Sequence, residues 1–389
     1  MSLKEHLTYF SEKIGPRGST TEKEKEAAEY SKRIFETLGC KPVIQKFKSA
    51  VSAWYPYAVF SFSFVLSETI YLATENKTLL ILISVLSLMS IISIIMELSF
   101  RNNLFRTFLP KGESQNIICK IKPNGEIRNK VVVLGHIDTH RSPFIFSTAG
   151  RTKFFQKLVP LGFSSSLLLL IIYTLSIFKQ IIFFKWFSLI PSLFLLLIFI
   201  LTIQADFTEY SPGANDNATG ASIILSLAQK IRENPLNQTE VWLVNSGCEE
   251  VGCYGADALA KEYQEELKDC YWIAVDGVGT LDSNPTYITQ ETFLFTTKSD
   301  KELLKKIKEI SEKNPELELK EASFRGAYTE GAIGGKYGFK VLTFMSFAKT
   351  GELGEWHRPT DTLDRVDIKT VEKTEKAVFE LIKSIDNEE

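Results

Sequence analysis

The stretch TEVWLVNSGCEE, residues 239–250, is the most informative part of this 389-residue chain. Its apolar first half is typical of a buried strand, and Glu249 and Glu250 stand side by side where that strand should end. Neighbouring carboxylates repel each other, and burying one is costly unless a positive group compensates it. The pattern therefore predicts a buried strand whose carboxyl end faces a cation.

Further strand patterns alternate with helix patterns on both sides of this stretch. Strands are predicted at 116–122, 130–136, 271–279 and 340–347. Helices are predicted from Thr20 or Thr21 to Leu38 and at 221–234, 255–267, 300–313 and 368–386. This alternation predicts an α/β fold, a three-layer α/β/α sandwich around a mixed, mostly parallel sheet.

Four long apolar runs interrupt the α/β pattern, at roughly 54–73, 79–98, 162–178 and 186–204. About 20 helical residues, rising ~1.5 Å each, cross a hydrocarbon layer of ~30 Å. The runs show almost no polar face, which favours membrane spans over core helices of a soluble domain. Glu68 is the one ionisable residue inside them apart from the terminal Glu97. We expect Glu68 near the far membrane interface, the alternative being a functional buried acid.

The four spans form two transmembrane hairpins, 54–98 and 162–204, and each hairpin returns the chain to its starting side. Residues 1–53, 99–161 and 205–389 therefore share one side and are expected to build one domain. More lysines and arginines flank the spans on the domain side than on the far side, which predicts a multi-pass membrane protein with this domain in the cytoplasm. The first 50 residues show no signal peptide.

Charge and cysteine content restrict the function further. The formal net charge of −2 gives no sign of a nucleic-acid partner. Five cysteines, an odd number without framework spacing, predict free thiols in a reducing compartment. Cys248 and Cys253 bracket the glutamate pair and are close enough in sequence to form a bridge.

Histidines and acids gather where the predicted strands end. They are His136, Asp138, Asp216, Glu249, Glu250, Asp276 and His357. Each alone has an ordinary structural explanation, but together these groups would repel one another strongly without cations. Nitrogen and oxygen ligands in this mixture suit zinc, and other divalent ions also fit.

The order of these motifs resembles a known family. H-x-D, G-A-N-D-N-x-T-G, E-E-x-G-x-x-G, a strand-end Asp and W-H-x-P-x-D-T are similar to the two-zinc exopeptidases of family twenty-eight, which include aminopeptidases, plasma-type carboxypeptidases and glutaminyl cyclases. The resemblance covers the polar chain and none of the four spans. It implies that Asp216 bridges two zinc ions, with Glu250 and His357 completing one site and His136 and Asp276 the other.

The same resemblance implies the catalytic roles. Glu249 would be the general base, and Asp138 would orient the imidazole of His136. Tyr328 is a candidate oxyanion donor, or an ordinary loop tyrosine. Glu330 stands where the family often has Asp, and it would meet a substrate N-terminus or be a solvated loop acid. His140 is expected at the surface, or else beside the site.

The resulting prediction is a membrane-anchored, zinc-dependent aminopeptidase that acts on peptide substrates and contacts the lipid bilayer. A related amide-bond enzyme, of the glutaminyl cyclase or carboxypeptidase type, is the first alternative. A non-catalytic membrane scaffold is the second, although such a relative would be expected to lose ligands. A transporter is disfavoured because the spans contain almost no charge.

Overall fold

The computed structural model describes residues 1–387 and divides into two compact units. The first, here the sheet unit, comprises Met1–Val51, Lys111–Ser142 and the chain from Glu209 onward. The second, the helical unit, comprises Ser52–Pro110 and Pro143–Thr208. Its second segment begins earlier than the expected hairpin at residue 162, because one helix runs unbroken from Ala149 to Phe178, through Pro160.

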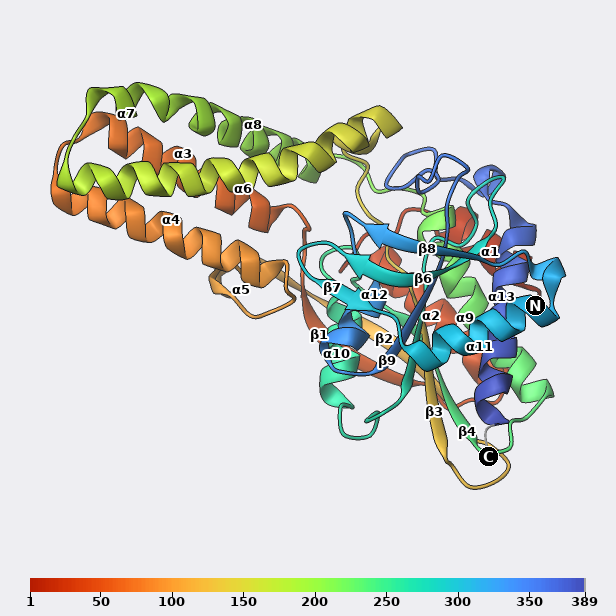
Figure 1. Ribbon diagram of the computed structural model, residues 1–389. Coiled ribbons are helices and arrows are strands. Elements are labelled where there is room, and N and C mark those ends of the chain that lie inside the picture. Colours follow the sequence, from red (N-terminus) through yellow and green to blue (C-terminus); the bar gives the residue numbers. More distant parts are fainter. Residues whose placement is uncertain (388–389) are drawn as a thin grey trace. The chain divides into compact units, whose positions relative to one another are not determined.

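One sheet carries the nine strands of the described residues, in the order β1-β2-β4-β3-β5-β9-β6-β7, with β8 paired to β6 (Figure 1). The strands are β1 Val43–Ala50, β2 Lys111–Ile121, β3 Asn129–His136, β4 Thr239–Ser246, β5 Tyr271–Val275, β6 Pro285–Thr292, β7 Thr296–Lys298, β8 Lys320–Arg325 and β9 Lys340–Ser346. The central strands β4-β3-β5-β9 are parallel to one another. Antiparallel pairs flank them on both sides, so the sheet is mixed and its parallel character is confined mainly to the centre.

Helices pack against this sheet. They are α1 Leu3–Thr8, α2 Glu22–Thr37, α9 Thr219–Glu233, α10 Tyr254–Glu262, α11 Lys301–Lys313, α12 Glu330–Lys336 and α13 Ile368–Asp386. Short helical turns are η1 Tyr9–Ile14, η3 Ala214–Ala218, η4 Pro315–Leu317 and η5 Leu363–Arg365. Alternate residues of β3, such as Val131 and Val133, share one buried core with α1, α2, α9, α11 and α13. Trp272 of β5 instead bonds to α12, donating its indole N–H to the carbonyl of Glu330. Successive side chains of a strand point to opposite faces of the sheet, so one strand can contact different helices on its two faces.

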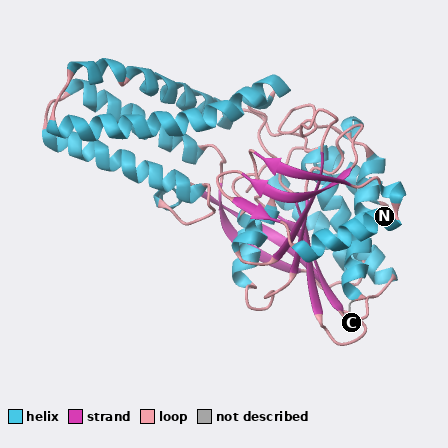
Figure 2. Ribbon diagram, viewed as in Figure 1, coloured by secondary structure: helices cyan, strands magenta, loops and turns pink. Residues whose placement is uncertain are grey.

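The helical unit consists almost entirely of helices and carries no strand among its described residues (Figure 2). Its elements are α3 Tyr55–Ala73, α4 Lys77–Glu97, α5 Leu104–Phe108, η2 Phe144–Phe146, α6 Ala149–Phe178, α7 Ile182–Phe187 and α8 Leu189–Asp206. By length and composition, four helical stretches of the described chain could cross a membrane: Tyr55–Ala73, Lys77–Glu97, Ala149–Phe178 and Ile182–Asp206. This finding suggests membrane association.

Glu68 lies inside the helical unit, five residues before α3 ends, and is 4% exposed. Its carboxylate accepts hydrogen bonds from the hydroxyls of Tyr173 (2.9 Å) and Ser188 (2.8 Å). A second pair, Tyr71 and Ser176, joins the same helices through a 2.8 Å contact between hydroxyls. These bonds satisfy an acid that would be costly to bury unpaired, and they connect α3, α6 and the start of α8.

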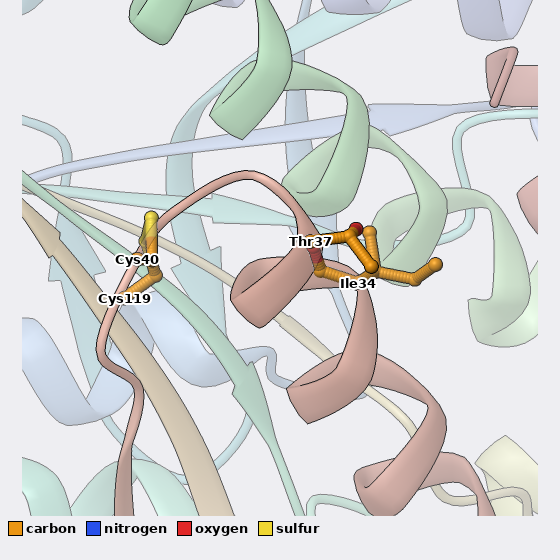
Figure 3. Close-up of a disulfide and its surroundings, with 4 residues drawn as sticks. All are labelled: Ile34, Thr37, Cys40 and Cys119. Atoms are coloured by element: carbon orange, nitrogen blue, oxygen red, sulfur yellow. A yellow bond between two sulfur atoms is a disulfide. The ribbon is translucent and has the colours of Figure 1, made fainter.

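A disulfide joins Cys40, just after α2, to Cys119 of β2 (Figure 3). The prediction of free thiols is therefore wrong for this pair, whose cysteines are 79 residues apart in the chain. Cys248, Cys253 and Cys270 are free and buried, so the glutamate pair is not bracketed by a bridge. Disulfides are typical of oxidising compartments, in contrast to the cytoplasmic side predicted from the flanking cations.

Candidate metal centre

The parallel strands β4, β3 and β5 deliver the first site residues to one edge of the sheet. The register pairs His136, the last residue of β3, with Ser246, the last residue of β4. Glu249 and Glu250 follow β4, and Asp276 directly follows β5. Because the carboxyl ends of adjacent parallel strands lie together, the strand order alone brings an imidazole and three carboxylates to one place.

Asp216 stands between two imidazoles. Its Oδ1 lies 3.4 Å from Nε2 of His136, and its Oδ2 lies 3.4 Å from Nε2 of His357. His136 Nε2 is also 3.6 Å from Asp276 Oδ1, and His357 Nε2 is 3.1 Å from Glu250 Oε2. The structure thus brings all five predicted metal ligands together, in two groups that share Asp216.

The donor atoms fit divalent cations. His136, Asp216 and Asp276 offer ligand atoms within 4.8 Å of one another, and so do His136, Glu249 and Glu250. Two buried atoms of these residues, His136 Nε2 and Glu250 Oε1, have no hydrogen-bond partner within the described chain. Buried polar atoms are normally satisfied, so two atoms without a partner among these ligands fit a metal centre.

Asp361 positions Asp216 through the backbone. Its fully buried carboxylate accepts the N–H of Asn215 (2.7 Å) and the N–H of Asp216 (3.0 Å). Burial raises the pKa of Asp361 to about 8. The buried guanidinium of Arg17 donates to the carbonyls of Pro212 and Gly213, one turn before Asp216. Asp361 lies in the W-H-x-P-x-D-T motif, but neither its role nor that of Arg17 is predictable from the local pattern.

Two carboxylates hold the corner that carries the glutamate pair. Asp138 accepts the N–H of Glu249 (3.0 Å) and the N–H of Glu250 (3.2 Å). Glu24 of α2 accepts the N–H of Cys248 at 2.8 Å. Cys248 has φ +54°, in the left-handed region that non-glycine residues seldom adopt. Three consecutive amides are therefore fixed, which points the two glutamates in defined directions.

Asp138 also lies against His136, through both its backbone carbonyl and its carboxylate, and its role in orienting the imidazole stays a prediction. The imidazole Nδ1 makes its hydrogen bond with the backbone carbonyl of Asp138 (3.1 Å), and the carboxylate Oδ1 lies 3.4 Å away. Because a carbonyl can only accept, this bond places a proton on Nδ1 and leaves Nε2 facing Asp216.

Glu249 is buried beside these groups. Burial raises the pKa of Glu249 well above its usual range, an effect that His136 opposes and Glu250 increases. Burial likewise raises the pKa of Glu250 to about 7. The thiol of Cys253 donates to Glu249 Oε1 at 3.2 Å. Carboxylates crowded in this way ionise readily only beside compensating positive charge.

Glu330, His140 and Tyr328 each had two alternative predictions, and their burial decides between the alternatives for the first two. Glu330 is 3% exposed at the start of α12, so the solvated-loop interpretation is wrong, and burial raises its pKa to about 7. His140 is 6% exposed, so the surface interpretation is wrong too. Tyr328 packs its ring edge-on against Phe293, 5.8 Å away, and its oxyanion role stays a prediction.

The chain is similar to known proteins in sequence motifs and in fold. The family model for peptidase family M28 matches residues 201–382. No curated protein matches the chain. The solved structure of BSAP, a zinc aminopeptidase from Bacillus subtilis, is similar with a TM-score of 0.59 and 15% identity, over 98% of this chain and 94% of that one.

Two structures from Bacteroides thetaiotaomicron are similar over 100% of this chain and 98% of their own, each with a TM-score of 0.58. One is a leucine aminopeptidase precursor (13% identity) and the other a glutaminyl cyclase (14% identity). The fold is therefore that of the zinc aminopeptidases and glutaminyl cyclases. Together with the family match, this confirms the resemblance to that group of enzymes noted from the motifs.

Proposed function

We propose that this chain is a membrane-anchored, zinc-dependent aminopeptidase that hydrolyses N-terminal peptide bonds. The observation that carries the proposal is the position of Asp216, whose two carboxylate oxygens face His136 on one side and His357 on the other. One carboxylate shared by two donor groups is the arrangement that two neighbouring cations need.

The proposal assigns two zinc ions to the five ligands, with other divalent ions possible. His136, Asp216 and Asp276 would hold one ion, and Asp216, Glu250 and His357 the other. When bound, two such ions lower the pKa of a shared water and polarise the scissile carbonyl.

Glu249 is proposed as the general base. It follows Cys248, whose left-handed backbone turns the chain, so that Glu249 and Glu250 need not point the same way. Its Oε1 accepts the thiol of Cys253, and we therefore assign proton transfer to Oε2. In this role Glu249 takes a proton from the attacking water and passes it to the leaving amine.

Membrane anchoring is proposed from the distribution of side chains in the helical unit. Its interior contains many fully buried serines, including Ser61, Ser67, Ser87, Ser166 and Ser188. Its outer surface carries large apolar side chains, including Leu82 (57% exposed), Ile171 (54%) and Leu193 (62%). Apolar residues such as Phe64 and Leu169 are buried there as well, so the distinguishing feature is the apolar outer surface. Such a surface is unfavourable in water, whereas an apolar surface over an interior with many small residues is typical of helices packed in lipid.

The experiment compares free and N-blocked aminoacyl reporters, together with an N-terminal glutaminyl peptide, for the full chain in detergent micelles. We expect cleavage of free N-termini only, and a loss of about 10²- to 10⁴-fold in kcat for Glu249→Gln. Cleavage of blocked substrates would rule out an aminopeptidase. Cyclisation without hydrolysis would favour the glutaminyl cyclase type, which is the second candidate because such an enzyme shares the fold.

A further inference from the structure

His140 and His357 form a buried pair of parallel rings beside the proposed metal centre. Their ring centroids are 3.8 Å apart and their planes differ by 11°. His140 is 6% exposed and His357 8%. The Nδ1 of His140 bonds to the carbonyl of Arg141 at 2.6 Å, which places the proton on Nδ1 and leaves Nε2 as an acceptor.

Two roles for His140 are consistent with this proximity. Its ring nitrogen lies within 4.8 Å of ligand atoms of Glu250 and His357, so it could be a third imidazole ligand. Alternatively, it could act through the stacked ring alone. The geometry of the pair decides between them.

An imidazole binds a metal through a lone pair in the plane of its ring, at about 2.0–2.1 Å. The ring centroids are 3.8 Å apart, and stacked rings in contact lie about 3.5 Å apart, so the two nearly parallel planes cannot both contain the same ion. An ion placed midway would lie about 1.7–1.9 Å out of each plane, close to the whole length of a Zn–N bond of about 2.0–2.1 Å. The stacked pair therefore cannot share an ion.

We propose that His140 is a positioning residue that fixes the ring plane of His357, and that it is not itself a metal ligand. This inference rests on the proposed metal centre and adds a residue to it. His140 touches the ligand and acts on the cation only through it.

His357 needs such support more than the other four ligands do. His136 ends β3, Asp276 follows β5, and the amides of Asp216 and Glu250 are held by carboxylates. His357 instead lies in the irregular segment between β9 and η5 and has φ +55°. Backbone in this region is unfavourable for a non-glycine residue and persists only where the surroundings hold it.

The backbone of His140 is held close to the sheet, so its ring can restrict the position of the His357 ring. It lies four residues beyond the end of β3, and its backbone carbonyl accepts the N–H of Ser211 at 2.8 Å. The adjacent Thr139 pairs with Gly18 as an isolated bridge. His357 also contacts Trp356, at a ring distance of 4.2 Å and a tilt of 33°, so His140 supplies the parallel contact.

The test uses the full chain in detergent micelles, with Co²⁺ and Zn²⁺ as probes. His140→Phe keeps a ring that can stack but cannot ligate, and His140→Ala removes both. Measured quantities are ions bound per chain, their affinities in competition with a chelator, and the visible absorption of the Co²⁺ form, which reports the ligand set. Melting temperatures check that each variant folds.

We expect two ions per chain in all three proteins, and the same Co²⁺ spectrum. His140→Ala should bind one ion up to about tenfold more weakly, because an aromatic pair contributes on that scale. His140→Phe should stay within about twofold of the wild type.

Equal weakening in both variants with an altered Co²⁺ spectrum would overturn the proposal, because His140 would then be a ligand. Unchanged affinity in both variants would overturn it as well, since the stack would then have no effect. A wild-type chain that binds no ion would refute the metal centre itself, and this inference with it.

Discussion

Replacing Asp138 with asparagine tests whether this carboxylate holds the corner that carries the glutamate pair. In the wild type its Oδ1 accepts the N–H of Glu249, and its Oδ2 accepts the N–H of Glu250 and the hydroxyl of Ser19. Whichever way the asparagine amide turns, its NH₂ group faces one of these amide donors. One hydrogen bond to a charged acceptor is then lost and a buried donor is left unsatisfied, at a cost of about 1.5–3 kcal/mol.

This cost corresponds to about 10- to 150-fold more frequent local opening. Hydrogen exchange of the peptide around residues 245–256, in metal-free and zinc-loaded full chain, measures it directly. Ser19→Ala is the matched control, because it removes a donor to the same carboxylate and leaves the amides bonded, so its effect should stay below about fivefold. Unchanged exchange in Asp138→Asn, together with weaker metal binding, would refute this reasoning and restrict Asp138 to the support of His136.

Three further predictions concern the base, the crowded acids and the disulfide. Glu249→Gln should retain two ions per chain while losing kcat, and loss of an ion would show that Glu249 is a ligand. Glu24 and Asp361 have pKa values raised by burial to about 8, so the native state binds more protons than the unfolded chain between their ordinary values and pH 8. The metal-free protein should therefore lose stability as pH rises from 6.5 to 8, by up to about 1.4 kcal/mol per pH unit for each acid. Bound zinc should reduce this loss. A melting temperature of the metal-free protein that rises over this pH range would contradict the prediction. Alkylation of the unfolded chain should label three thiols before reduction and five after it, whereas five before reduction would show that Cys40 and Cys119 are not bonded in the cell.

Local patterns in the sequence were sufficient to place the residues that end strands. His136, Glu249, Glu250 and Asp276 follow apolar runs, and adjacent parallel strands bring such positions together. His357 does not follow a predicted strand. Its position beside the other ligands could be predicted only from the order of the family motifs.

Residues that act through distant contacts were not predictable in this way. Glu24 lies 224 positions from Cys248 in the chain, and its contact with that amide depends on how α2 packs beside the sheet. The Cys40–Cys119 pair likewise depends on the neighbourhood of α2 and β2. A mixed sheet was predicted, but which strands run antiparallel was not, since strand direction is set by tertiary pairing and not by the pattern of one strand.

The burial of His140 and Glu330 was not predicted, for a different reason. Both are polar residues outside the predicted strands and helices, and such residues are mostly exposed. Here each is buried close to other ionisable groups, where a charged or polar side chain can be compensated. Unexpected burial of this kind marks the surroundings of a functional site.

The most direct test of the central claim is anomalous diffraction at the zinc absorption edge from crystals of the full chain. The account predicts two zinc peaks per chain, one among His136, Asp216 and Asp276 and the other among Asp216, Glu250 and His357. A single peak, no peak, or peaks away from Asp216 would contradict it.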